Sequence, residues 1–324
     1  MVGFFKSLFS GSAGKERPEG SAREEANEKE KQRKFDILKY DGLKALKIGK
    51  TGYAARCFRE ALALREEFQT LTYLATACVR LQETEEALAV YDRLAELDPG
   101  FKDTFLNRAQ LYYGENEPEK ALEECRRTLA LDETDHRAYL LMARALRELG
   151  RQEEAVAACS KAAELPEGKA EALLLRTELY MGWNRPQEAL EDAGLLIGLH
   201  PEEENAYLLR GRAHEALQAP EKALGDYRQV IELNPFNEQG YLEAARILIG
   251  TEQAEAAIAL LEEAIEQLPG FAGAYIARAK AREVLGDAEG AAADLKTAEE
   301  LQENDTEHEY KPVNFNDLYA NRPL

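Results

Sequence analysis

The sequence predicts an all-α fold in which about eight helix pairs stack one after another. The main observation is a column of alanines that recurs with a first step of 33 residues and later steps of 34. These alanines are Ala54, Ala87, Ala121, Ala155, Ala189, Ala223, Ala257 and Ala291. A fixed period of this length is typical of solenoids, in which each unit buries its apolar face against its neighbours.

Three more columns keep the same phase when each unit is numbered so that its alanine is position 20. The fourth position is large and apolar: Leu38, Leu71, Phe105, Tyr139, Leu173, Tyr207, Tyr241 and Tyr275. The eighth is small: Gly42, Ala75, Ala109, Ala143, Thr177, Gly211, Ala245 and Ala279. The twenty-fourth is apolar and of varied size: Phe58, Tyr91, Cys125, Cys159, Ala193, Tyr227, Leu261 and Leu295. Such alternation of large and small side chains indicates two interlocking helices per unit.

Prolines stand where the helices of a unit should begin or end. The unit boundaries carry prolines in phase with each other: Pro99, Pro201, Pro235 and Pro269. Pro118, Pro186 and Pro220 precede a column alanine by three residues, where the first turn of the second helix tolerates a missing N–H. The first unit is the least regular, because it is one residue short and lacks an aromatic residue at the fourth position.

These columns resemble the tetratricopeptide repeat, a helix pair with the pattern aromatic, small, alanine, aromatic and boundary proline. The resemblance covers residues 35–305 and implies a right-handed α-solenoid superhelix of about eight helix-turn-helix units. We therefore divide the chain into a flexible charged N-terminal segment (1–34), the repeat array (35–305) and a C-terminal tail (306–324).

The two ends of the chain carry apolar residues outside the array. Val2, Phe5 and Phe9 share one helical face, so that residues 1–10 form a short amphipathic start. This start could dock into a partner, lie on a membrane or fold back into the chain's own groove, and we favour a protein contact. The C-terminal tail, with Phe315 and Tyr319, could dock within the chain as a cap on the last helix.

Charge and composition exclude several classes of partner. The chain has 61 acidic and 41 basic residues, a formal net charge of −20, which repels nucleic acid and anionic lipid. No apolar run approaches the length of a membrane span, and the N-terminal sequence lacks the features of a secretory signal. The four cysteines show no metal or redox spacing and are predicted to be core residues. We therefore expect a cytoplasmic protein without an integral membrane segment.

The sequence predicts no catalytic residue, cofactor or metal site. None of the four histidines is paired with a second histidine at helical spacing or with a cysteine cluster. Adjacent glutamates such as Glu85 and Glu86 are expected near helix starts, where they favour the helix dipole.

The functional signal lies on the first helix of each unit, whose fifth, ninth, twelfth and thirteenth positions line a concave groove in the family that the chain resembles. Six consecutive units carry an aliphatic residue at the fifth position: Leu106, Leu140, Leu174, Leu208, Leu242 and Ile276. Cations gather at the ninth and twelfth positions of the C-terminal half: Arg144, Arg147, Arg212, Arg246 and Lys280. An apolar floor with basic side chains suits an acidic peptide or an amphipathic helix.

Two interpretations of this surface remain open. The leucines could belong to the shared core, and Arg144, Arg147 and Arg212 could pair internally with Glu178, Glu148 or Glu215. The function that we predict is a non-catalytic scaffold or adaptor that binds a peptide or helix of a partner protein. The alternative is a regulatory or assembly subunit of an enzyme complex whose chemistry is supplied by the partner.

Overall fold

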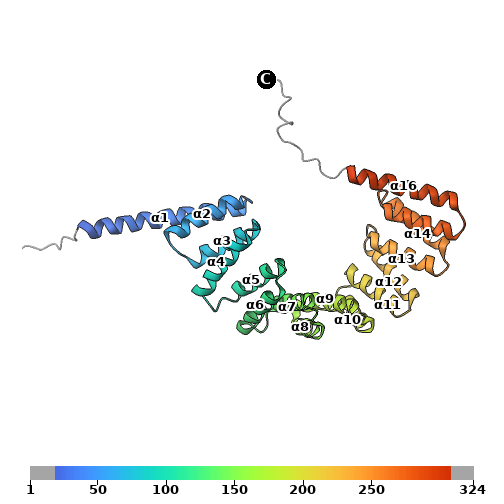
Figure 1. Cartoon of the computed structure of the whole chain (residues 1–324), viewed down its shortest axis with the longest axis horizontal. Coiled ribbons are helices and arrows are strands. Elements are labelled where there is room, and N and C mark those ends of the chain that lie inside the picture. The colour runs from blue at the N-terminus through green and yellow to red at the C-terminus, as the bar shows by residue number, and fades with distance from the viewer. Residues whose placement is uncertain (1–18, 308–324) are drawn as a thin grey trace, which may run out of the picture. The chain divides into compact units, whose positions relative to one another are not determined.

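The computed structural model describes residues 19–307, which form sixteen α-helices and one 3₁₀ turn, Pro166–Gly168 (Figure 1). The first helices of the successive pairs are α1 (Glu19–Lys47), α3 (Phe68–Arg80), α5 (Lys102–Gly114), α7 (His136–Glu148), α9 (Lys169–Gly182), α11 (Glu204–Ala216), α13 (Glu238–Gly250) and α15 (Ala272–Val284). The second helices are α2 (Thr51–Leu64), α4 (Thr84–Leu97), α6 (Pro118–Leu131), α8 (Gln152–Glu164), α10 (Pro186–Leu199), α12 (Pro220–Leu233), α14 (Ala254–Gln267) and α16 (Ala288–Glu307). The predicted all-α array of about eight helix pairs is confirmed.

The helices fall into two compact parts, with α1–α6 in residues 1–133 and α7–α16 in residues 134–324. Within each part, a first helix packs on the second helix of its own pair and on the helices of the adjacent pair. Three second helices begin at the predicted prolines: α6 at Pro118, α10 at Pro186 and α12 at Pro220. None of the described helices is both long enough and apolar enough to cross a membrane.

The helices of a pair interlock at positions 8 and 24. A Cβ atom on Gly211 would lie 2.6 Å from Cε1 of Tyr227, and Gly42 is equally close to Phe58. In the fifth unit the larger side chain is at position 8 and the smaller one at position 24, since these residues are Thr177 and Ala193, and both are buried. Each unit therefore fills the same space with a different division of volume between its two helices.

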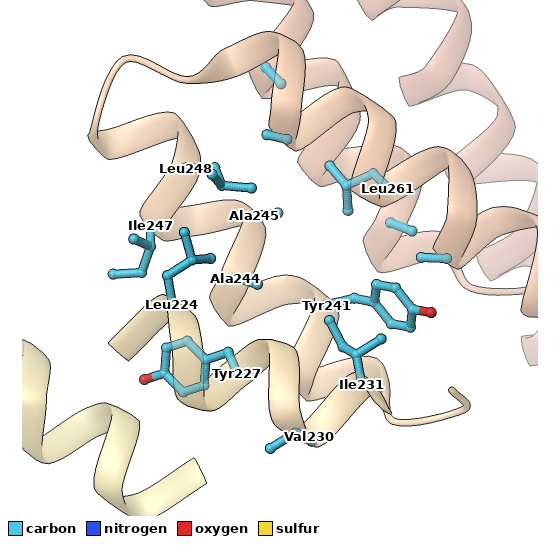
Figure 2. Packing of buried hydrophobic residues seen from close by; sticks show 14 of the residues in the cluster. Leu224, Tyr227, Val230, Ile231, Tyr241, Ala244, Ala245, Ile247, Leu248 and Leu261 are labelled. Carbon is cyan, nitrogen blue, oxygen red and sulfur yellow. The ribbon is translucent and has the colours of Figure 1, made fainter. Parts of the chain in front are cut away.

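Within each of the two parts, the core continues from one helix pair to the next through the face that a first helix turns toward the preceding second helix. Figure 2 shows this between α12 and α13, where Ile231 points toward the ring of Tyr241. Gly240 allows the close approach, because a Cβ atom there would meet Val230 at 3.1 Å. Where a second helix precedes it within the same part, the residue at position 3 of a unit is consequently small and buried: Thr70, Thr104, Ala172, Ala206, Gly240 and Ala274.

All eight turns between the two helices of a pair share one backbone conformation. The residue at position 15 has a left-handed backbone in each: Gly49, Gln82, Asn116, Gly150, Asn184, Gln218, Glu252 and Gly286. The N–H that follows returns to the helix end, as from Gln253 to the carbonyl of Leu248 at 2.8 Å. This is the Schellman arrangement, in which glycine is preferred because it lacks a Cβ atom.

Replacing Glu252 by Gly is therefore expected to raise the free energy of unfolding by about 1 kcal/mol, since a left-handed L-residue costs roughly 1–2 kcal/mol and glycine loses some of that gain as unfolded-state entropy. Gly150→Ala, at the equivalent turn, should lower it by a similar amount. Urea denaturation followed by circular dichroism measures both changes. Equal stability of the Glu252→Gly variant and the unmodified chain would contradict this account of the turn.

The helix α1 begins at Glu19, well before the first repeat unit starts at residue 35. Residues 24–34 of this helix are exposed. This stretch has no apolar period, but it is rich in helix formers and carries local pairs such as Lys31 with Glu28 at 3.2 Å. The predicted amphipathic start and the predicted C-terminal tail lie largely outside the described residues.

Buried ion pairs join the two helices in four units, at positions 7 and 23. The pairs are Arg108 with Glu124, Arg176 with Asp192, Arg210 with Asp226, and Arg278 with Asp294. Where position 7 is apolar, position 23 is apolar as well: Leu74 with Val90, Met142 with Ala158, and Ala244 with Leu260. The polar and apolar versions therefore substitute for each other within one fold.

Candidate functional site

A cavity of about 360 Å³ lies between α13 and α15, the first helices of the last two units. Its lining residues are Leu242, Arg246, Ile249, Gly273, Ile276, Ala277 and Lys280. Four of these are predicted groove residues, namely Leu242, Arg246, Ile276 and Lys280, and the structure places them around one hollow. The cavity has aliphatic side chains on its floor and two cations among its lining residues.

Small residues of the eighth unit account for the space. Positions 2 and 6 of that unit are Gly273 and Ala277, whereas the equivalent residues of the preceding unit are Gln239 and Glu243. Neither small residue was predicted as a groove residue from the sequence, although their combination is absent from the seven preceding units. Ile249 was not predicted either, although it occupies the twelfth position, the same position as Arg147.

The guanidinium of Arg246 is held by two carboxylates. It donates to Glu215 at 2.6 Å and to Glu243 at 2.9 Å, and the hydrogen bond to Glu215 is the main cause that raises the pKa of Arg246. Glu215 also accepts the hydroxyl of Tyr227, whose pKa is raised first by burial and then by this bond. A buried tyrosine thus fixes the acid that orients a cation beside the cavity.

Lys280 differs from Arg246, because no ion pair of its ammonium group occurs with the side chains described, those of residues 24–303, and its side chain is exposed. A lysine ammonium is a strongly hydrated point charge on a flexible stem, so it can reach an incoming carboxylate without first losing a partner. The cavity therefore offers one oriented cation and one adaptable cation.

The other predicted cations have acidic neighbours. Arg144 donates to Glu171 at 2.7 Å, and Arg147 lies 3.5 Å from Glu148 and 3.8 Å from Glu178. These are exposed pairs, which contribute little to stability and can exchange partners.

Arg212 lies beside a second cavity, of about 390 Å³, that also includes Leu208 and Met181. Its Nη2 atom is 3.9 Å from Glu243, a longer separation than in the Arg246 pair. Leu174 lines a third cavity, of about 250 Å³, together with Glu171 and His200.

The aliphatic residues at the fifth position divide into two groups. The side chains of Leu106, Leu140 and Leu208 are buried, whereas those of Leu174, Leu242 and Ile276 are half-buried. A ligand gains contact area only from surface that is still exposed, so the second group is the one that offers an apolar floor.

In the part of the chain that contains α1–α6, the thiol of Cys78 and carboxylate oxygens of Glu83 and Glu86 lie within 4.8 Å of one another. Arg59 pairs with both acids, at 2.7 Å from Glu86. Burial raises the pKa of Cys78 to about 11, so that its thiol stays protonated at neutral pH. Both acids are therefore already engaged by the Arg59 guanidinium, and the cluster is explained as a structural ion-pair network.

The repeated helix pairs and their eight equivalent turns define a helical repeat protein, and comparison with known families gives the kind of repeat. A family model described as tetratricopeptide repeat matches residues 42–100 and 178–238, and one described as anaphase-promoting complex, cyclosome, subunit 3 matches residues 80–162. The chain is a tetratricopeptide repeat protein. Proteins of this family typically mediate protein–protein interactions. None of the curated proteins matches the sequence.

Solved structures share the fold at low sequence identity. A tetratricopeptide repeat protein from Parabacteroides merdae is 19% identical with a TM-score of 0.56, over 82% of this chain and 99% of that one. Pseudomonas aeruginosa pilF is 20% identical with a TM-score of 0.51, over 63% and 92%. PilW, described as a type IV pilus biogenesis factor, is 19% identical with a TM-score of 0.52, over 62% and 94%.

Proposed function

We propose that this chain is a non-catalytic scaffold that binds an acidic segment of a partner protein, anchored at the cavity between α13 and α15. The cavity itself is the observation that supports the proposal, because it combines exposed apolar surface with Arg246 and Lys280. An aliphatic or aromatic side chain of the partner would enter between Leu242 and Ile276, where burial of apolar area gives about 25 cal/mol per Å². A neighbouring carboxylate would then meet the two cations.

The charge of the rest of the molecule makes this site selective. The chain has a formal net charge of −20, so an acidic segment is repelled by most of its surface. Arg246 and Lys280 provide local attraction at the cavity, and this local positive charge would fix where and in which direction the segment docks. Arg144, Arg147 and Arg212 would extend the contact along α7 and α11 by exchanging their exposed acidic neighbours for the partner's carboxylates.

The test is binding to an array of short synthetic peptides that vary in acidic and apolar residues. Changing Arg144, Arg212, Arg246 and Lys280 to Glu should weaken binding of acidic peptides by about tenfold or more, because charge-assisted hydrogen bonds contribute about 1.5–3 kcal/mol. The matched control reverses four exposed cations on second helices: Arg126, Lys161, Arg228 and Lys296.

A second variant separates the cavity from the charges. Ala277→Leu fills the space between Leu242 and Ile276 without changing the net charge, and it should remove the preference for an apolar residue while a weaker preference for acids remains. Binding that is unchanged in both the charge-reversed protein and the Ala277→Leu protein would refute the proposed site.

A second candidate function is a regulatory or assembly subunit of an enzyme complex. The observation in its favour is the match of residues 80–162 to a model of a subunit of a multiprotein complex. Co-purification with an enzyme whose rate depends on this chain would distinguish it from a simple adaptor. A cytoplasmic location remains a prediction for either function, and it is tested by cell fractionation.

A further inference from the structure

The first helix of the array exposes a face that is covered in later units. At the third position, Ile37 is 51% exposed, whereas the equivalent Thr70, Thr104 and Ala206 are at most 1% exposed. In those units the preceding second helix covers the position, and no described helix precedes α1. The repeat architecture thus leaves one packing face of α1 without its usual neighbour.

This face is apolar and hollowed. Ile37 and Tyr40 lie at helical spacing on α1, Ile48 directly follows the last residue of α1, and Tyr53 at the start of α2 continues the strip. Tyr40 is 67% and Ile48 is 62% exposed. A cavity of about 320 Å³ adjoins the strip and is lined by Asp41, Lys44, Ala45, Ile48, Lys50 and Tyr53. We call Ile37, Tyr40, Ile48 and Tyr53 the α1 strip.

We propose that residues 2–9 of the same chain dock on the α1 strip and cap the N-terminal end of the array. These residues precede α1 in the sequence and carry the complementary pattern, with Val2, Phe5 and Phe9 on one helical face and Phe4 and Leu8 beside them. They supply the short apolar helix that the repeat architecture lacks at this end. End units of a solenoid otherwise leave core surface in contact with water.

The length of the connecting chain fits this arrangement. Ten residue steps separate Phe9 from Glu19, and they span at most about 33–36 Å. Ile37 lies about 27 Å along the helix from Glu19 at 1.5 Å per residue, with a lateral offset of about 8–10 Å between packed helices. Phe9 therefore reaches the level of Ile37, and an antiparallel helix then brings Val2 about 10 Å further, to the level of Lys44.

The connecting sequence suits an extended, exposed path. Residues 10–18 read SGSAGKERP, which is rich in glycine, serine and charge and offers no apolar side chain large enough to compete for the strip. Residues 24–34 of α1, which this path would follow, are exposed and strongly charged, so they give residues 2–9 no alternative apolar surface.

The test compares hydrogen exchange of the α1 amides in the full chain and in two doubly substituted chains. Phe5→Asp with Phe9→Asp should speed exchange of residues 37–48 by about fivefold or more, because water regains access to the α1 strip. The matched control is Ser7→Asp with Ser10→Asp, which adds the same charge on the opposite side of the segment and should leave exchange unchanged. Circular dichroism establishes that both variants keep their helix content.

Two results would overturn the proposal. One is equal exchange of residues 37–48 in the unmodified chain and the Phe5→Asp, Phe9→Asp chain. The other is protection that rises with protein concentration in step with dimer formation by sedimentation, because the strip would then be covered by a second copy. Cross-linking of the F9C/I37C chain within monomers, and its absence in an S7C/I37C chain, would support the docked arrangement further.

Discussion

Replacing Asp226 by Ala is expected to lower the free energy of unfolding by about 3 kcal/mol, because the change leaves the Arg210 guanidinium largely buried without its partner. Arg210 on α11 donates through Nε to both carboxylate oxygens of Asp226 on α12, at 3.0 and 3.1 Å. The Asp226 side chain is 7% exposed and that of Arg210 is 28% exposed. Urea denaturation gives the stability, and hydrogen exchange of α11 and α12 locates the loss.

The seventh unit of this chain provides the matched control. Ala244 and Leu260 occupy the positions of Arg210 and Asp226 there, and Ala244 is fully buried. The double change Arg210→Ala with Asp226→Leu should therefore restore most of the lost stability, since apolar replacement of a buried ion pair is often neutral or stabilising. A double variant as unstable as Asp226→Ala alone would show that the loss comes from another contact of Asp226.

Gly211→Thr is the second change with a large expected effect, a loss of about 3 kcal/mol. The new side chain would enter the ring of Tyr227, whose Cε1 atom is 2.6 Å from the ideal Cβ position, and overpacking of a filled core typically costs about 1–3 kcal/mol or more. Tyr227→Ala alone should lose about 3–5 kcal/mol, because it leaves a cavity of aromatic size beneath Glu215.

Combining Gly211→Thr with Tyr227→Ala should cost much less than the sum of the two separate losses. The pair then has the composition of Thr177 and Ala193, which the fifth unit packs in the same place. Denaturation of the four proteins gives the coupling energy, for which we expect at least 2 kcal/mol of mutual compensation, within the range for residues in contact. Additive losses would mean that positions 8 and 24 do not share one packing space.

The order of helices could be predicted because it depends on residues that repeat. The alanines of position 20 and the helix-starting prolines, such as Pro118, impose the same local geometry in each unit, and a wrong phase would bury charge. The start of α1 was harder to predict. Residues 19–34 lack apolar periodicity, and their helix is stabilised by composition and local pairs such as Lys31 with Glu28.

The candidate site depends on differences between units, which a search for repeating columns tends to overlook. Gly273 and Ala277 open the cavity because they are smaller than their equivalents, and Glu215 orients Arg246 from a different helix. The i, i+16 association of Arg210 with Asp226 was present in the sequence as a pair of co-varying columns. The two columns can be recognised as an ion pair once the structure shows that α11 and α12 face each other at these positions.

The four cysteines make the first four units individually observable. Cys57, Cys78, Cys125 and Cys159 are buried, one in each successive unit, and burial raises the pKa of Cys159 to about 12. An alkylating reagent can therefore modify each thiol only when its own helix pair opens. The order in which the four sites become labelled would report where this array begins to come apart and in which direction the opening spreads.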